Sequence, residues 1–292
     1  MPHDHNHDHN HSPTITNVSR TLVIGAVLNI AYVVVEFGMG LYTQSLALMA
    51  DAGHNLSDVA GLLLSLLAFR LAKVKSSQTF TYGYRKSTVL ASLTNAVLLL
   101  VAVGGILLES IQRFRHPEPV MGGLVAWVAA LGIVINAASA LLFFRQKDHD
   151  LNMRGAYLHL LSDALVSVAV VASGIIISYT HWFWLDPIMG IVVAIVILVS
   201  TWQLLTHSLR LSLDGVPTNI NLADVQAEIT AVAGVEKVHH VHIWAMSTTE
   251  NALTAHLILQ PNLTNDQITA IRKEVRHGLE HLSITHATLE TE

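Results

Sequence analysis

Six long apolar runs occupy the first two thirds of the chain, separated by short polar segments. They lie near residues 18–41, 45–71, 87–114, 120–144, 155–179 and 185–205. A helix needs about 20 mainly apolar residues to cross the hydrocarbon layer of a bilayer, and each run approaches or exceeds that length. The pattern therefore predicts a polytopic membrane domain with six transmembrane helices.

A more polar region with shorter elements begins after residue 213. Here we expect a helix, two strands, a second helix and a last strand, over residues 222–233, 238–246, 253–260, 265–282 and 284–289. This order predicts a small α+β domain with its helices on one face of the sheet. The chain then divides into a tail, a membrane domain and a soluble domain, over residues 1–17, 18–213 and 214–292.

Basic residues are concentrated in two of the loops between the apolar runs. Arg70 ends the second run, and four more lie between the second and third runs. Three lie between the fourth and fifth, whereas the loops after the first and fifth runs have none. The loop after the third run, with Arg113 and Arg115, is a minor exception. Because basic residues favour the cytoplasmic side of a membrane, we expect both termini to be cytoplasmic.

Composition supports the membrane assignment and narrows the ligand chemistry. The hydrophobic fraction is 52% and the mean hydropathy is +0.49, which is too apolar for a soluble domain of this size. The chain has no cysteine, so the available strong metal ligands are His, Asp and Glu. The soluble domain holds four basic against ten acidic residues, and we expect it to attract cations and not nucleic acid.

The second and fifth runs carry the same polar motif, His-x-Leu-Ser-Asp. It supplies His54 with Asp58, and His159 with Asp163. On a helix this spacing places imidazole and carboxylate on one face, one turn apart. A single such pair is most often a satisfied interior polar pair, but two matched ionisable pairs inside membrane helices favour a functional site. Two nitrogens and two oxygens from facing helices form a tetrahedral set that suits zinc.

Further polar residues have two interpretations each. Asp51, about one turn before His54, is either a transient metal ligand or a charge at a helix N-terminus. Glu36 is interpreted as a structural acceptor between helices, with a proton relay as the alternative.

The acidic first segment has histidines at His3, His5, His7, His9 and His11. We expect it to be disordered, and either to hold weak, exchangeable metal sites or to be a solvated tail without function.

Histidines also gather on the predicted strands of the soluble domain. They are His239, His240, His242, His256 and His286. Such residues are usually part of the polar face of a half-exposed sheet. Five of them on three neighbouring strands make a second metal site an equal alternative.

These motifs together resemble the cation diffusion facilitator family, in its bacterial zinc-efflux branch. The resemblance extends over nearly the whole chain. It rests on Ser45-Leu46-Ala47-Leu48, Ala50-Asp51-Ala52-x-His54-x-x-x-Asp58, Phe80-x-Tyr82-Gly83-Tyr84, Asn152-x-Arg154-x-Ala156-x-x-His159-x-x-x-Asp163 and Val238-His239-His240-Val241-His242-Ile243-Trp244. The paired His-x-x-x-Asp motif is specific to the zinc-type members.

The resemblance implies a homodimer in the bacterial inner membrane, with a six-helix membrane domain. It also implies a ferredoxin-like cytoplasmic domain that binds zinc and aids dimerisation, with the ligands His239, His256, His286 and Glu292. An ion pair between Lys86 and Asp214 is implied where the two domains join, as a hinge.

The expected function follows from the ligand set. Zn²⁺ binds neutral imidazole, so metal binding and protonation compete at such a site. We expect a Zn²⁺/H⁺ antiporter that exports zinc, with Cd²⁺ as a further candidate cargo, and not an enzyme. The alternative is an intramembrane zinc hydrolase, which needs three ligands and an open position for water. Four symmetric ligands and the absence of His-Glu-x-x-His argue against it. A passive metal sensor would leave the six spans unexplained.

Overall fold

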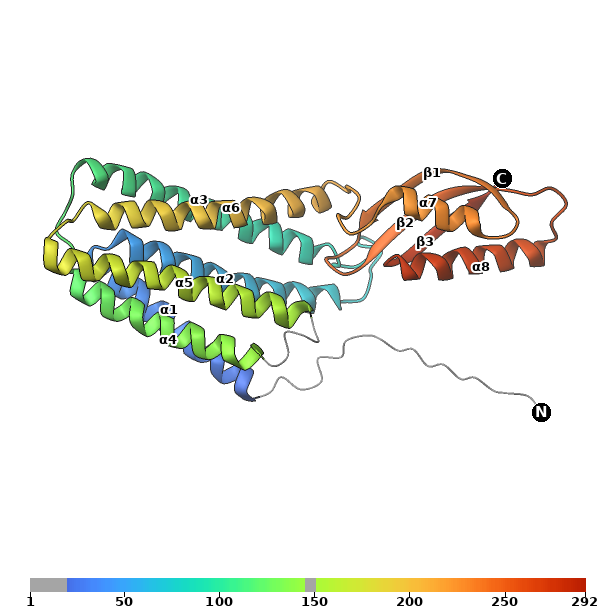
Figure 1. Ribbon diagram of the computed structural model, residues 1–292. Helices are drawn as coiled ribbons and strands as arrows, with labels where there is room; N and C mark the ends of the chain where they lie inside the picture. The colour runs from blue at the N-terminus through green and yellow to red at the C-terminus, as the bar shows by residue number, and fades with distance from the viewer. Residues whose placement is uncertain (1–19, 145–150) are drawn as a thin grey trace.

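The structure is a computed structural model that describes residues 20–144 and 151–292. It is elongated, with long helices at one end and a small α/β unit at the other (Figure 1). The predicted metal-binding histidines of the tail, His3 to His11, lie outside the described residues.

Long helices form at each of the predicted apolar runs. Their bounds are Arg20–Thr43 (α1), Leu46–Ala72 (α2), Ser87–Arg115 (α3), Gly122–Phe144 (α4), Leu151–Thr180 (α5) and Leu185–Ser212 (α6). Within the described part of the chain, five helices, α2 to α6, are long and apolar enough to cross a membrane. The helix α1 is not among these five, so a sixth span stays a prediction.

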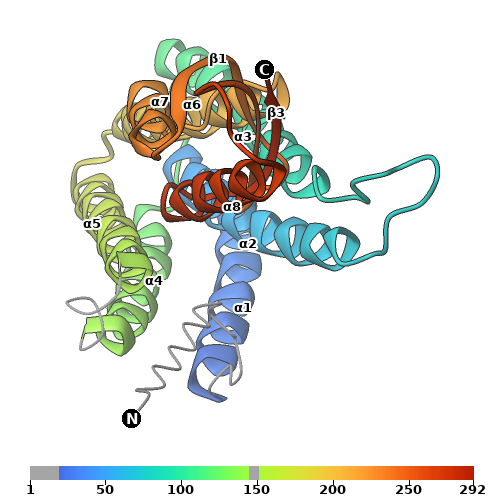
Figure 2. The same ribbon diagram turned by 90° about the vertical axis from the view of Figure 1, so that its right-hand side faces the viewer.

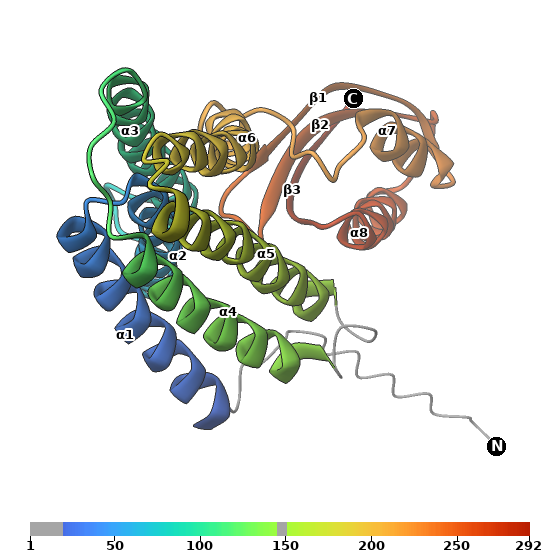
Figure 3. The ribbon, with the colours of Figure 1, turned by 60° about the vertical axis from the view of Figure 1, so that its left-hand side comes forward.

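The helices pack as neighbouring pairs with small residues at their contacts. α4 lies along α5 and α3 along α6, while α2 contacts α1, α3 and α6 (Figures 1, 2 and 3). Ala47, Ala50 and Ala129 are fully buried in this core. Large apolar side chains such as Val101 and Trp127, by contrast, are 70% and 77% exposed. An apolar exterior of this kind fits contact with lipid and not with water.

A buried carboxylate joins two of these helices, α2 and α6, at the residues where they begin. Asp186, at the start of α6, is fully buried. It accepts hydrogen bonds from the Ser45 hydroxyl and, at 2.7 Å, from the backbone N–H of Leu46 at the start of α2. The first N–H groups of a helix have no partner within the helix. Asp186 of α6 is the hydrogen-bond acceptor for one of these N–H groups and thereby fixes α2 against α6.

The second unit has the predicted order of helices and strands. Its elements are Leu222–Ala231 (α7), Val235–Ala245 (β1), Asn251–Leu259 (β2), Asn265–His281 (α8) and Ile284–Thr291 (β3). The strand order is β1-β2-β3, with β1 and β2 antiparallel and β2 and β3 parallel. α7 and α8 cover one face of the sheet (Figure 3). Ile229, Leu253 and Leu279 are fully buried between these layers.

Polar contacts connect the two units where α3 begins. Lys86, which precedes α3, forms an ion pair with Asp214, just after α6. Arg85 donates to Glu250 at 2.7 Å, in the turn between β1 and β2. The backbone N–H of Thr248 in the same turn donates to the Thr88 hydroxyl at 3.0 Å. The start of α3 is therefore tied to both α6 and the sheet.

Removing the buried carboxylate should loosen the helix bundle. Asp186→Ala leaves the Ser45 hydroxyl and the Leu46 N–H without their acceptor, and a buried polar group without a partner costs about 1–3 kcal/mol. We expect a lower thermal unfolding midpoint for the detergent-purified protein. Glu118→Ala changes an exposed carboxylate, and its midpoint should match that of the unaltered protein. Equal midpoints for the two variants would show that Asp186 does not hold the helices.

Candidate metal sites

A cavity of about 370 Å³ lies between α2, α3, α5 and α6 in the membrane domain. Its walls are mainly apolar, but polar side chains also line it, including Ser200 and Thr201 of α6. The polar residues on the facing helices α2 and α5 are Asp51, His54, Ser162 and Asp163, and α3 adds Asn95. The cavity therefore combines space for an ion with oxygen and nitrogen donors.

The predicted ligands His54 and Asp163 approach each other in this cavity. His54 Nε2 of α2 lies 3.6 Å from Asp163 Oδ1 of α5, and the two side chains are only 18% and 7% exposed. α2 and α5 run in opposite directions (Figure 1). On antiparallel helices this contact puts positions 58 and 159 level with each other, one turn further along. The side chains of Asp58 and His159 themselves lie outside the described residues.

Asp51 lines the same cavity and is held by other helices. Ser167 of α5 donates a hydrogen bond to Asp51 Oδ2 at 3.1 Å, and both residues are buried. The carboxyl group of Asp51 also lies close to that of Glu36 of α1. Ser167 was not expected from the sequence, although it lies one turn beyond Asp163 on the same helix, and that spacing could have indicated it.

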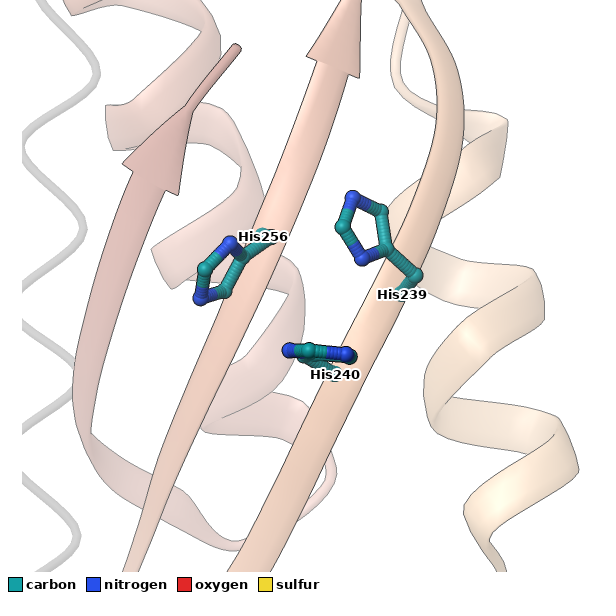
Figure 4. A group of neighbouring side chains, drawn as sticks. All are labelled: His239, His240 and His256. Atoms are coloured by element: carbon teal, nitrogen blue, oxygen red, sulfur yellow. The ribbon is translucent and has the colours of Figure 1, made fainter.

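A second group of ligands lies on the sheet of the soluble unit. The rings of His239 and His240 on β1 and of His256 on β2 converge (Figure 4). One ring nitrogen from each lies within 4.8 Å of the others. Glu292 completes the group, with Oε1 2.8 Å from His256 Nδ1 and Oε2 3.2 Å from His239 Nε2. We call these four residues the sheet cluster.

Sheet register explains why these residues meet. His239 is directly opposite His256 on the antiparallel strands. A β-bulge between His239 and His242, with His240 in the left-handed region at φ 49°, breaks the alternation of side chains. The side chains of His239 and His240 then point to the same side of the sheet, whereas consecutive side chains of a regular strand point to opposite sides. His240 therefore joins the group through backbone geometry that the sequence does not reveal.

The same register keeps His286 away from the sheet cluster within one chain. On the parallel strand β3, His286 is level with Ala252, whereas Glu290 is level with His256. His286 instead packs edge-on against Tyr82 of the α2–α3 loop, with 5.6 Å between ring centres. His242 is paired with Thr254, beyond the bulge. Glu290, which sequence reasoning missed, lies 3.5 Å from His256 Nε2.

The sheet cluster favours a bound cation. Hydrogen bonds from His256 and His239 hold the pKa of Glu292 below its usual value, so this carboxylate is ionised at neutral pH. Three imidazoles and a carboxylate form a donor set that suits Zn²⁺. Both candidate sites thus combine nitrogen and oxygen ligands.

Comparison with known proteins assigns the chain to a family. Residues 22–211 match the cation efflux transmembrane domain, and residues 217–292 match the cation efflux protein, cytoplasmic domain. The chain belongs to this cation efflux family, the cation diffusion facilitators. It is a metal cation efflux transporter and not an enzyme.

Named relatives are similar along most of their length. The cadmium, cobalt and zinc/H(+)-K(+) antiporter of Bacillus subtilis (strain 168) is 34% identical, over 100% of this chain and 92% of its own. The zinc transporter ZitB of Escherichia coli (strain K12) is 36% identical, over 100% and 93%. The metal cation efflux system protein CzcD of Cupriavidus metallidurans is 34% identical, over 94% and 86%.

The unexpected member of the sheet cluster can be tested directly. In the full-length protein with Asp163→Ala in the membrane cavity, His240→Ala should weaken Zn²⁺ binding to the sheet at least about tenfold, because one imidazole ligand is lost. Calorimetric titration measures this affinity. His242→Ala is the matched control, since it removes an exposed histidine of the same strand outside the cluster. Equal affinities in the two variants would remove His240 from the site.

Proposed function

We propose that this protein exports Zn²⁺ from the cytoplasm in exchange for protons. The cargo binds between α2 and α5 to His54, Asp58, His159 and Asp163. The observation that carries this proposal is the approach of His54 to Asp163 across antiparallel helices, inside a cavity. The printed names of the relatives, which include zinc transport and exchange with H⁺, support it.

Exchange follows from the chemistry of these ligands. An imidazole binds Zn²⁺ only when neutral, and a carboxylate only when ionised, so each ligand releases its proton as the metal binds. If the site faces the two sides of the membrane in turn, cytoplasmic Zn²⁺ displaces protons and external protons displace Zn²⁺. The intramembrane hydrolase has no support, because the family and the relatives are transporters. Cd²⁺ is a further candidate cargo, as in the printed name of the Bacillus subtilis relative.

We infer a sixth span and a cytoplasmic soluble domain. α1 has 24 residues, and at 1.5 Å per residue it is about 36 Å long, enough to cross a bilayer. Its Val27 and Val34 are 59% and 65% exposed, as lipid contact requires. The basic α2–α3 loop lies at the end of the bundle that contacts the soluble unit, and basic residues favour the cytoplasm. The proposed domains are residues 1–17, 18–213 and 214–292, in the bacterial inner membrane with both termini cytoplasmic.

We further propose that Zn²⁺ at the sheet cluster regulates transport in a homodimer. The matching cytoplasmic domain is consistent with dimerisation. The arrangement helix–strand–strand–helix–strand, with β2 and β3 parallel and both helices on one face, is compatible with a ferredoxin-like fold. The contacts of Arg85 and Lys86 then connect the regulatory sheet to the membrane helices.

Loss of one cargo ligand should abolish transport. In liposomes with an imposed pH gradient, Asp163→Ala should reduce Zn²⁺ uptake to that of protein-free vesicles, because a carboxylate and its charge are removed from the site. Asp224→Ala changes an exposed carboxylate of α7 and should transport at the rate of the unaltered protein. Uptake by Asp163→Ala at the control rate would refute the ligand assignment, and uptake that ignores the pH gradient would refute proton exchange.

The ion pair between the domains should matter for regulation more than for stability. Lys86 and Asp214 have side chains that are 36% and 64% exposed, and exposed pairs contribute only about 0–1 kcal/mol. Lys86→Ala should therefore reduce activation by Zn²⁺ with little change in the unfolding midpoint. The charge swap Lys86→Asp with Asp214→Lys should restore part of the activation. Additive losses in the swapped protein, measured as transport rate against free Zn²⁺, would mean that the two residues act separately.

A further inference from the structure

A buried pair of carboxyl groups lies between α1 and α2, behind the cargo cavity. Glu36 of α1 and Asp51 of α2 are 0% and 1% exposed. The two carboxyl groups lie close enough for each to act on the charge of the other. A hydrogen bond can form between them only when one carries a proton, because carboxylate oxygens can only accept.

Neutral hydrogen-bond donors surround the carboxyl group of Glu36. The Tyr32 hydroxyl donates to Glu36 Oε1 at 2.6 Å, and the Asn55 amide donates to Oε2 at 3.3 Å. Tyr32 is the titratable neighbour on α1, and Asp51 is the one on α2. From α4, the Val128 carbonyl lies 3.4 Å from the Tyr32 hydroxyl, and Gly132 packs against the Tyr32 ring. Among the described residues, no Lys or Arg forms a hydrogen bond or ion pair with Glu36.

Two adjacent carboxyl groups at such a place cannot both be ionised. Each charge would lose its hydration, and the like charges would repel each other at short range in a medium of low dielectric constant. The pair therefore holds at least one proton in the metal-free protein. Glu36 does not line the cargo cavity and lies 18 positions before His54, so this proton is separate from those of the predicted ligands.

Asp51 connects this proton to the cargo cavity. Its Oδ2 accepts a hydrogen bond from Ser167 of α5, and its carboxyl group lies close to that of Glu36. It also lines the cavity beside His54 and Asp163, the next titratable groups. A divalent ion there would place two positive charges near Asp51 and would favour loss of a proton from the pair.

We propose that Glu36 is a second proton-binding site of the exchange cycle, with Asp51 as the group through which its proton enters and leaves. When Zn²⁺ enters the cavity, the O–H bond of Glu36 breaks and the proton passes to the Asp51 carboxylate. Asp51 then releases it to water in the cavity, and Glu36 stays as a carboxylate whose charge the bound cation offsets. Protonation reverses these steps when Zn²⁺ leaves. This assignment rests on the proposed Zn²⁺/H⁺ exchange and replaces the structural role that the sequence favoured for Glu36.

Glu36→Gln separates a proton carrier from a structural residue. Glutamine has the shape of a protonated glutamate, can donate to Asp51 and can accept from Tyr32, but it cannot release a proton. We therefore expect Zn²⁺ affinity near that of the unaltered protein and about one proton fewer released per Zn²⁺ bound. The measurement is Zn²⁺ titration of the full-length protein in weak buffer with a pH indicator. Glu118→Gln, the same change at an exposed position, should release as many protons as the unaltered protein.

The outcomes distinguish this inference from the proposed function. If the unaltered protein releases no protons on binding Zn²⁺, both fail. If it releases protons and Glu36→Gln releases the same number, the exchange stands and the role of Glu36 is overturned.

Infrared difference spectra keep the inference testable if Glu36→Gln does not fold. Added Zn²⁺ should remove a carbonyl band of a protonated carboxylic acid from the spectrum of the unaltered protein. Tyr32→Phe deletes one hydrogen bond to Glu36 and should shift the frequency of that band. A spectrum in which Zn²⁺ removes no such band, or a band that Tyr32→Phe leaves in place, would overturn the assignment.

Discussion

Polar side chains inside an apolar helix bundle can find hydrogen-bond partners only among one another. This constraint decides how the helices of the membrane domain pack together. The approach of His54 to Asp163 brings α2 and α5 together at the cavity. Asp186 fixes the start of α2 against the start of α6, and the hydrogen bond from Asn55 to Glu36 joins α2 to α1. Each of these polar groups would destabilise the folded protein if it lay within the membrane without a hydrogen-bond partner. The contacts that hold the bundle are thus also the ones that provide its chemistry.

The two candidate metal sites differ in what surrounds them. His54 and Asp163 lie in a mainly apolar cavity, where bound charge has few compensating groups besides the ligands and nearby protonatable carboxyl groups. Such a place favours tight coupling between metal and protons. The sheet cluster is more exposed, with Glu292 open to water. An exposed site can follow the free Zn²⁺ concentration, which suits a sensor connected to the helices through Lys86 and Arg85.

Much of this arrangement was predictable from local sequence pattern. The His-x-x-x-Asp spacing predicted the facing of His54 and Asp163, and residue periodicity predicted the helix and strand order of the soluble unit. Residues that depend on register were not predictable. His240 enters the sheet cluster through a β-bulge, and Glu290 takes the place beside His256 because β3 is parallel to β2. The pairing of Glu36 with Asp51 depends on the packing of α1 on α2, which spacing along the chain does not specify.

X-ray absorption at the zinc edge tests the central claim most directly, namely that imidazole and carboxylate ligands from α2 and α5 hold the cargo. The sample is full-length protein with His239→Ala and His256→Ala, which remove two ligands of the sheet cluster, loaded with no more than one Zn²⁺ per chain. The account predicts four light ligands at about 2.0–2.2 Å, with the scattering pattern of two imidazole rings, and loss of this spectrum with Asp163→Ala. Six oxygen ligands without imidazole, or an unchanged spectrum with Asp163→Ala, would contradict it.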